Sequence, residues 1–173
     1  DDSGRWHPLI LHLLDVAAGA DAIFAREPES TRKRMGEILG LEWEEARGWI
    51  LLLIACHDLG KACPSFQAKW PKRPPVLGLR LPRAIDEKVN HGFVGQLALA
   101  ELLKEIEWPG NLAELVADAV GCHHGNRASE REKDKAAGEI YVGRGSRLEI
   151  VRSDWSQARA ALFDALRQVF EPT

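Results

Sequence analysis

The chain has 173 residues, a length that suits one domain with a substantial buried core. Apolar residues make up 45 % and charged residues 28 %, which is an ordinary balance for a soluble globular protein. The net charge of −3 gives no whole-chain indication of nucleic-acid binding, so a partner of that kind requires a local basic patch.

The three cysteines, Cys56, Cys63 and Cys122, have no regular spacing, which argues against a disulfide framework. Reduced thiols and a cytoplasmic location are therefore expected. Cys56 and Cys122 each precede a histidine, but without a CxxC pair they are interpreted as small buried hydrophobic residues rather than zinc ligands. The longest apolar run, residues 49–56, is too short to span a bilayer, and no signal peptide is visible, so no membrane association is predicted.

Three helices are predicted in the first third of the chain. Apolar residues recur at helical spacing over about residues 7–26. A second helix is predicted over residues 30–39 and ends at Gly40. A third runs from about residue 42 to His57, and its apolar C-terminal half is expected in the core.

The stretch from Lys61 to Lys88 is predicted to be a loop with one short helix around residues 65–69. Four of the nine prolines lie between Pro64 and Pro75, and proline interrupts regular structure. Seven basic residues stand against two acidic ones, so this stretch carries a net charge of +5. The charge indicates a path for phosphates, along which Phe66 or Trp70 can stack on a base, although packing is the preferred interpretation of both aromatic residues.

The remaining elements are also mostly helical. A fourth helix begins at His91, a fifth covers about residues 112–123, and a last amphipathic helix spans about residues 154–170. Residues 126–150 are charged, contain several glycines and are interpreted as an exposed excursion that allows a short β-hairpin around residues 140–150. The predicted architecture is all-α, in a single domain over residues 1–173.

Most histidines lie on or at the ends of the predicted helices. The chain has six: His7, His12, His57, His91, His123 and His124. Side chains at such positions converge on one pocket of a helical bundle, and imidazole and carboxylate are the usual ligands of divalent transition metals. Asp58 follows an apolar run, where an ionised carboxylate needs a partner, and its two oxygens can bridge two metals. His7 is interpreted as a residue that helps to cap the first helix.

The order of these residues resembles the HD superfamily of metal-dependent phosphohydrolases. A closer resemblance is to the HD nuclease domain of the type I CRISPR-associated nuclease-helicase. It rests on "HPLILHLLDVAAGA", "ACHDLGKACPSFQAKW", "NHGFVGQLAL" and "VGCHHG", which occur in the family's order between about Trp6 and Gly125. The resemblance implies an HD-domain helical bundle that cleaves single-stranded DNA endonucleolytically, with exonucleolytic continuation left open.

The resemblance also implies the ligands of one or two divalent metals. Carried over by motif, they are His12, His57, Asp58, His91, His123 and His124. Lys61 matches the family's lysine near the scissile phosphate, so Asp58 and Lys61 are the predicted catalytic residues. A histidine-rich set favours Mn²⁺, Ni²⁺, Co²⁺, Fe²⁺ or Zn²⁺ over Mg²⁺.

Two features depart from the family pattern. Families of this type add a late aspartate, and the available candidate, Asp154, is better interpreted as a cap of the last helix. No GxxxxGK[ST] loop occurs, so no helicase domain is present, and the chain is expected to be a separate nuclease subunit or an excised domain. By resemblance its partners are an SF2-type helicase domain or subunit and the Cascade complex.

Two other functions remain open at this point. One is an HD phosphohydrolase that acts on nucleotides, which requires a small closed pocket. The other is a catalytically incomplete metal-binding domain that recruits partners, which the uncertain last carboxylate favours.

Overall fold

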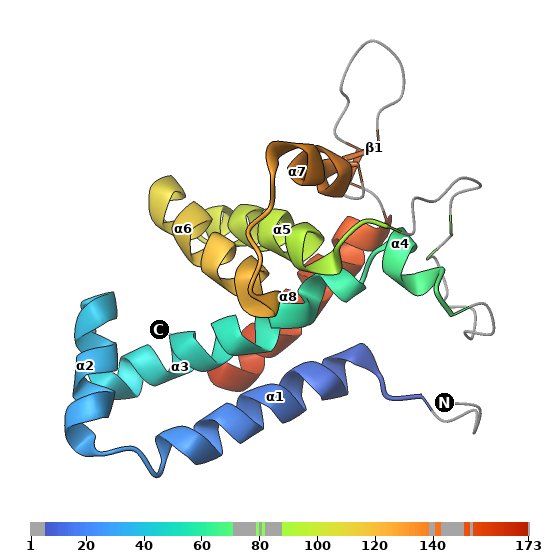
Figure 1. The fold of residues 1–173 in the computed structure, drawn as a ribbon. Coiled ribbons are helices and arrows are strands. Elements are labelled where there is room, and N and C mark those ends of the chain that lie inside the picture. The colour runs from blue at the N-terminus through green and yellow to red at the C-terminus, as the bar shows by residue number, and fades with distance from the viewer. Residues whose placement is uncertain are drawn as a thin grey trace. The chain divides into compact units, whose positions relative to one another are not determined.

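A computed structural model describes residues 6–70, 79, 81, 88–138, 141–142, 151–152 and 154–172. Apart from one pair of two-residue strands, the elements it describes are helices, which confirms the all-α prediction (Figure 1). None of the helices in these ranges is both long and apolar enough to cross a membrane. The chain forms two compact units: unit 1 comprises residues 1–56 and 164–173, and unit 2 comprises residues 57–163.

Unit 1 is built on three consecutive helices and the end of the last one. They are α1 (Leu9–Phe24), α2 (Glu29–Leu39), α3 (Trp43–Ala55) and residues 164–170 of α8 (Asp154–Phe170). Both α1 and α2 pack on α3 (Figure 1). Pro8 and Pro28 stand immediately before α1 and α2, where a fixed φ favours helix initiation, and Gly40 ends α2 with a φ of 72°.

The interior of unit 1 is apolar, with its ion pairs at the periphery. Its buried side chains include Leu13, Ala17, Ala46, Leu51, Leu52, Ala55 and Leu166. Asp21 on α1 accepts two hydrogen bonds from Arg47 on α3, at 2.7 and 2.6 Å. His7 does not cap α1 as predicted, because Pro8 precedes the helix without a side-chain cap and the His7 Nε2 lies 2.9 Å from Asp15.

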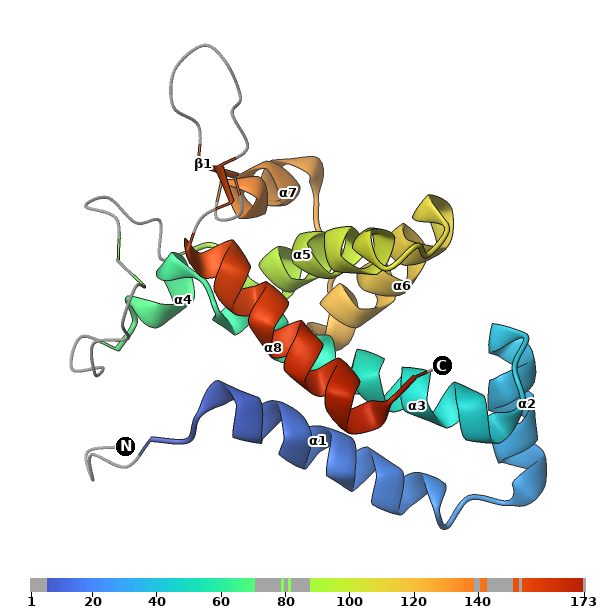
Figure 2. The same ribbon diagram turned by 180° about the vertical axis from the view of Figure 1, so that it is seen from behind.

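Unit 2 contains the remaining elements. They are most of the 3₁₀ turn η1 (Cys56–Lys61), α4 (Pro64–Gln67), α5 (His91–Glu105), α6 (Gly110–Gly121), the 3₁₀ turn η2 (Cys122–His124), α7 (Glu130–Ala137), β1 (Tyr141–Val142), β2 (Val151–Arg152) and the first part of α8. Helix α5 packs against both α6 and α7, and α5 and α6 lie side by side in both views (Figures 1 and 2). Its core therefore centres on α5, where Phe93, Val94, Ala98, Leu99 and Leu103 are buried.

Two helix ends and one further helix differ from the sequence prediction. The third helix ends at Ala55 rather than at His57, and the fifth ends at Gly121, so 3₁₀ turns carry the histidines that follow. Helix α7 lies in the segment interpreted as an excursion, and Ser129 and Glu132 form a capping box at its start. Strands β1 and β2 pair antiparallel, with Tyr141 opposite Arg152, close to the hairpin that the sequence allowed. Within the predicted basic loop, residues 71–78, 80 and 82–87 lie outside the described residues.

Candidate metal centre

Asp58 lies at a break in the helical path of the chain. Helix α3 ends at Ala55, and Asp58 within η1 has a φ of −108° and a ψ of 16°, values that are not helical. Its side chain is buried, with only 4 % of the residue exposed. Because removing an unpaired carboxylate from water is costly, this position requires positively charged or hydrogen-bonding neighbours.

Nitrogen atoms surround the Asp58 carboxylate. The ammonium of Lys61 lies 2.6 Å from Oδ2, and the Nε2 of His57 lies 3.1 Å from the same oxygen. Around Oδ1, the Nε2 of His91 lies at 3.0 Å and the Nε2 of His123 at 3.5 Å. Two turns and one helix start of unit 2 therefore bring four side chains of the predicted site to one carboxylate.

Small residues allow η1 to approach the first turn of α5. A Cβ atom at Gly60 would collide with the backbone carbonyl of His91 and the backbone nitrogen of Gly95, so only glycine fits. Helix α5 starts at His91 because the Asn90 side chain accepts a hydrogen bond from the Gly92 N–H at 2.8 Å. The glycine contact and the cap together set the position of the His91 ring relative to Asp58.

His123 presents an unprotonated nitrogen to the cluster. Its Nδ1 lies 3.0 Å from the Val120 carbonyl, which can only accept a hydrogen bond, so Nδ1 carries the proton and Nε2 keeps its lone pair. Burial lowers the pKa of His123. The hydrogen bond to the Val120 carbonyl raises this pKa in part, whereas the nearby His124 lowers it. Neutral imidazole is the form that binds metals.

These residues fit a divalent transition metal. Asp58, His91, His123 and His124 each offer one ligand atom, and the four atoms lie within 4.8 Å of one another. The Nε2 of His123 is buried and has no hydrogen-bond partner among the described residues. A coordinated ion would be a partner for this atom. The Nε2 of His124 lies 3.2 Å from that of His91, so both rings face the same point. Three imidazoles and one carboxylate form a donor set typical of transition metals.

The other predicted ligands are not members of this group of four. His57 contacts Asp58, and its ring packs edge-to-face on that of His123, with centroids 5.4 Å apart. His12 lies on α1 in unit 1, so its role as a ligand stays a prediction. Asp154 is exposed in the first turn of α8 and does not join the Asp58 group within the described part of unit 2.

The cysteines of this region belong to the interior. Cys56 and Cys63 are fully buried, and burial raises the pKa of the Cys56 thiol to about 12, so that it stays protonated near neutral pH. The Cys63 sulfur lies 3.2 Å from the Ser65 hydroxyl. Neither thiol contributes to a metal group in the described residues. Of the two cysteines interpreted as small buried hydrophobic residues, Cys56 is buried, whereas Cys122 is only half-buried.

A buried arginine, which no motif in the sequence indicates, supports the segment after Lys61. Arg159 on α8 is 1 % exposed, donates a hydrogen bond to the Ala62 carbonyl at 2.8 Å and donates a second to the Ser156 hydroxyl at 2.9 Å. In the sequence this arginine looks like one of the polar residues of an amphipathic helix. Its partner is a backbone carbonyl 97 residues away, which leaves no sequence signal.

A second set of contacts, which was also not predicted from the sequence, connects α5 with the segment around η2. Gln96 is 8 % exposed and donates to Asp118 on α6 at 3.0 Å, and Arg127 binds the other oxygen of Asp118 at 3.0 Å. The Gln96 side chain also packs against Gly121, where a Cβ would approach it to 2.6 Å. These contacts fix the residues on both sides of His123 and His124.

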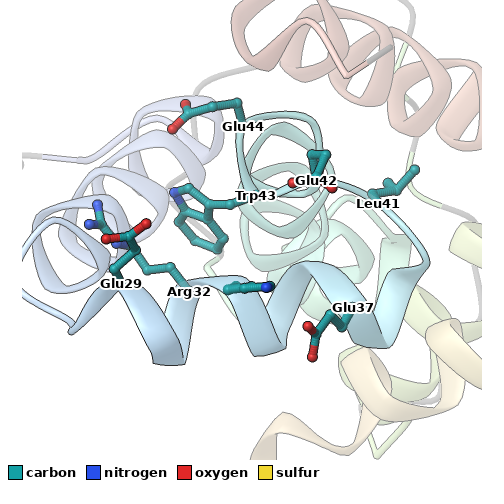
Figure 3. A pocket seen from close by; sticks show the side chains of 8 residues that line it. Glu29, Arg32, Glu37, Leu41, Glu42, Trp43 and Glu44 are labelled. Carbon is teal, nitrogen blue, oxygen red and sulfur yellow. The ribbon is translucent and has the colours of Figure 1, made fainter.

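A surface pocket of about 330 Å³ lies elsewhere, in unit 1 (Figure 3). Its lining mixes four carboxylates with two cations and one indole: Glu29, Arg32, Lys33, Glu37, Leu41, Glu42, Trp43 and Glu44. No residue of the predicted metal site lines it.

Comparisons with known proteins identify the family of the chain. The model of the family described as "Cas3, HD domain" matches residues 1–173. The CRISPR-associated endonuclease/helicase Cas3 of Thermus thermophilus is 42 % identical over 134 residues, which are 76 % of this chain and 14 % of that protein. The protein of the same name from Escherichia coli K12 is 28 % identical over 183 residues, covering 91 % of this chain and 20 % of that protein. The chain thus spans a fifth or less of these relatives.

Solved structures show the same fold. The Thermus thermophilus Cas3 HD domain, crystallised in the presence of Ni²⁺, is 34 % identical with a TM-score of 0.75, and the match covers 99 % of this chain and 63 % of that one. T. fusca Cas3 with AMPPNP matches with a TM-score of 0.75 at 21 % identity, over 98 % of this chain and 18 % of that one, a likeness of fold alone. The chain belongs to the family of Cas3 HD domains.

Proposed function

We propose that this chain hydrolyses phosphodiester bonds of single-stranded DNA, as the metal-dependent nuclease of type I CRISPR interference. The observation that carries the proposal is a buried carboxylate, Asp58, with three imidazoles and one ammonium within 3.5 Å of its oxygens. Membership of the Cas3 HD family supports it, since relatives in that family are named endonuclease/helicases.

Each residue of the cluster has a distinct part in this chemistry. A divalent metal held by Asp58, His91, His123 and His124 would make water a nucleophile near neutral pH and offset the charge of the phosphate. His57 contacts Oδ2 of Asp58 and so restricts the orientation of the carboxylate. Lys61 has a quarter of its side chain exposed, so its ammonium can meet the negative charge that develops on an incoming phosphate.

The donor set also supports a preference among metals. Imidazole nitrogens suit Mn²⁺, Fe²⁺, Co²⁺, Ni²⁺ and Zn²⁺, whereas Mg²⁺ prefers oxygen ligands in octahedral geometry. The structure of the Thermus thermophilus Cas3 HD domain was obtained in the presence of Ni²⁺. His12 is proposed as a further ligand, and one or two metal ions are proposed in total.

We further propose an SF2-type helicase and the Cascade complex as partners. The support is the double name of the relatives, endonuclease/helicase, of which this chain matches only the smaller part. A fold neighbour at 22 % identity is described as part of a CRISPR RNA-guided surveillance complex before nicking. Cleavage of DNA in the cytoplasm during antiviral defence would follow from such an assembly.

Circular single-stranded DNA tests the proposed activity. Purified protein with Mn²⁺ or Ni²⁺ should linearise the circle, and Asp58→Asn should slow cleavage by more than about 100-fold, because one ligand charge is lost. Asp134→Asn, an exposed carboxylate on α7, is the matched control and should cut at the normal rate.

The same assay separates the competing functions. An intact circle with every metal, in the presence of folded protein, contradicts the proposal. Hydrolysis of deoxynucleotides without cleavage of the circle would indicate a nucleotide phosphohydrolase. Metal binding without hydrolysis of either substrate would indicate a metal-binding domain that only recruits partners.

A further inference from the structure

We propose that Lys69 binds a phosphate of the DNA strand, the one next to the phosphate that binds at the Asp58 cluster. The Phe66 ring holds the Lys69 ammonium in position for this contact. The inference rests on the proposed function and adds a second phosphate site to it. It starts from the Phe66 ring, which packs edge-to-face on the His91 imidazole with centroids 5.1 Å apart. The Phe66 ring therefore lines the metal centre next to His91.

Two ammonium groups lie near the Phe66 ring. The Nζ of Lys61 lies 5.5 Å from the Phe66 ring centroid, and the Nζ of Lys69 lies 5.4 Å from it. Both distances are within the range of cation–π attraction, which favours a fixed position for each ammonium over the ring. The two nitrogens are consequently at most about 11 Å apart.

The two lysines differ in how their charges are compensated. Lys61 lies 2.6 Å from the buried Asp58 carboxylate. Lys69 is exposed and forms no ion pair with any carboxylate of the described residues. Two cations at one ring repel each other, so an anion between or beside them is favoured. Because Asp58 already compensates Lys61, Lys69 is the cation available to a substrate phosphate.

The backbone around α4 holds Lys69 close to the centre. Pro64 and Ser65 are buried, and the Gln67 side chain donates a hydrogen bond to the Lys61 carbonyl at 2.9 Å. The Lys69 N–H donates to the Phe66 carbonyl at 3.2 Å. The turn is thus attached to η1 on one side and to the core on the other, which lowers the entropy cost of a contact made by Lys69.

The two ammoniums are close enough to contact neighbouring phosphates of one strand. Their separation has an upper limit of about 11 Å, which places both within reach of a short stretch of an extended single strand. With one phosphate at the metal centre and Lys61, the next one along the strand reaches Lys69. A single nucleotide with one terminal phosphate group would leave Lys69 unused, so this site favours a polymer.

Binding of fluorescein-labelled oligothymidylate to the full chain, measured by anisotropy in EDTA across 50–200 mM NaCl, tests the inference without requiring cleavage. For a single strand, each lost phosphate contact lowers the slope of log affinity against log salt by about 0.7. Lys69→Gln should therefore weaken binding severalfold at low salt and reduce the slope by about that amount, while Lys69→Arg should keep it.

Lys104→Gln is the matched control. Lys104 lies 13 residues after His91 on α5, roughly 20 Å along the helix, and pairs with Glu114 at 2.6 Å. Its loss should change neither affinity nor slope. With metal, Lys69→Gln should raise KM and leave kcat unchanged, because the contact exists in both ground and transition states, whereas Lys61→Gln should lower kcat.

The outcomes separate this inference from the proposed activity. Equal affinity and slope for wild type and Lys69→Gln would overturn the second phosphate site, and so would a wild-type protein that does not bind the strand at low salt. A wild type that binds with the expected slope difference but cuts no DNA with any metal would support the site and contradict the nuclease.

Discussion

The two units of the chain use charged residues in opposite ways. In unit 1 the interior is apolar. Asp21 and Arg47 form an ion pair there, and each of the two side chains is about 40 % exposed. In unit 2 a carboxylate, an arginine and an amide are all buried, namely Asp58, Arg159 and Gln96. Because burying such groups costs free energy without contributing to an apolar core, their presence in unit 2 supports the proposal that the chemistry takes place there.

The largest difference between the units should appear when a methyl group is added to a glycine of each. Gly60→Ala would place its Cβ against the backbone of His91, which no side-chain movement can relieve. We expect a loss of about 3 kcal/mol in the free energy of unfolding and a large loss of Ni²⁺ affinity. Denaturant unfolding and calorimetric titration measure both.

Gly19→Ala on α1 is the counterpart in unit 1. No atom lies within 4 Å of the added Cβ, and alanine favours a helix, so stability should rise by about 0.5–1 kcal/mol. Equal effects of the two substitutions would contradict the close approach of η1 and α5.

Replacing the buried arginine of unit 2 should have the next largest effect. Arg159→Met keeps most of the side-chain volume but leaves the Ala62 carbonyl without its donor, so we expect a loss of about 2 kcal/mol in unfolding free energy. Cleavage should fall as well, since Ala62 follows Lys61. Arg131→Met, at an exposed position on α7, should change little. A stable, fully active Arg159→Met variant would show that this bond is dispensable.

The cluster should also make the metal-free protein sensitive to acid. Burial lowers the pKa of His123 in the folded chain, so the unfolded chain binds more protons as the pH falls below about 6.5, the ordinary pKa of the group. Stability from this group is present above that pH and is lost on acidification through the folded-state pKa. Thermal unfolding in EDTA from pH 8 to pH 5 should show the decline, and His123→Gln should reduce it. An unchanged pH dependence in this variant would argue against a neutral His123 in the folded chain.

The smallest effect is expected from the ion pair of unit 1. Arg47→Gln removes a half-exposed pair, and such pairs contribute up to about 1 kcal/mol. Stability should decline by no more than that amount, and Ni²⁺ affinity should not change. A large loss of metal affinity in Arg47→Gln would remove the distinction between the units.

The sequence predicted the order of the helices and the gathering of most site residues. The helical spacing of apolar residues placed α1, α2 and α8 to within about two residues, because those segments have clear periodicity. The position of the histidines at helix ends was enough to predict that His91, His123 and His124 lie close to Asp58. The 3₁₀ turns that carry three of these residues were not predicted, since 3₁₀ and α turns share the same local sequence preferences.

Contacts between segments far apart in the sequence could not be predicted. Arg159 binds a backbone carbonyl, and any residue at position 62 would offer the same carbonyl. Glycine is required at position 60 by the close approach of the α5 backbone, which cannot be seen in the sequence. Helix α7 was missed although Ser129 and Glu132 have the spacing of a capping box, because its mostly charged sequence lacks an apolar face.

Anomalous scattering tests the central claim most directly. Crystals of the full chain soaked in Ni²⁺ or Mn²⁺ and measured at the metal absorption edge should show a peak within bonding distance of Asp58, His91, His123 Nε2 and His124. Asp58→Asn crystals should lose or weaken this peak. Folded protein at saturating metal with no peak at these four residues, or with its only peak elsewhere, would contradict the metal centre.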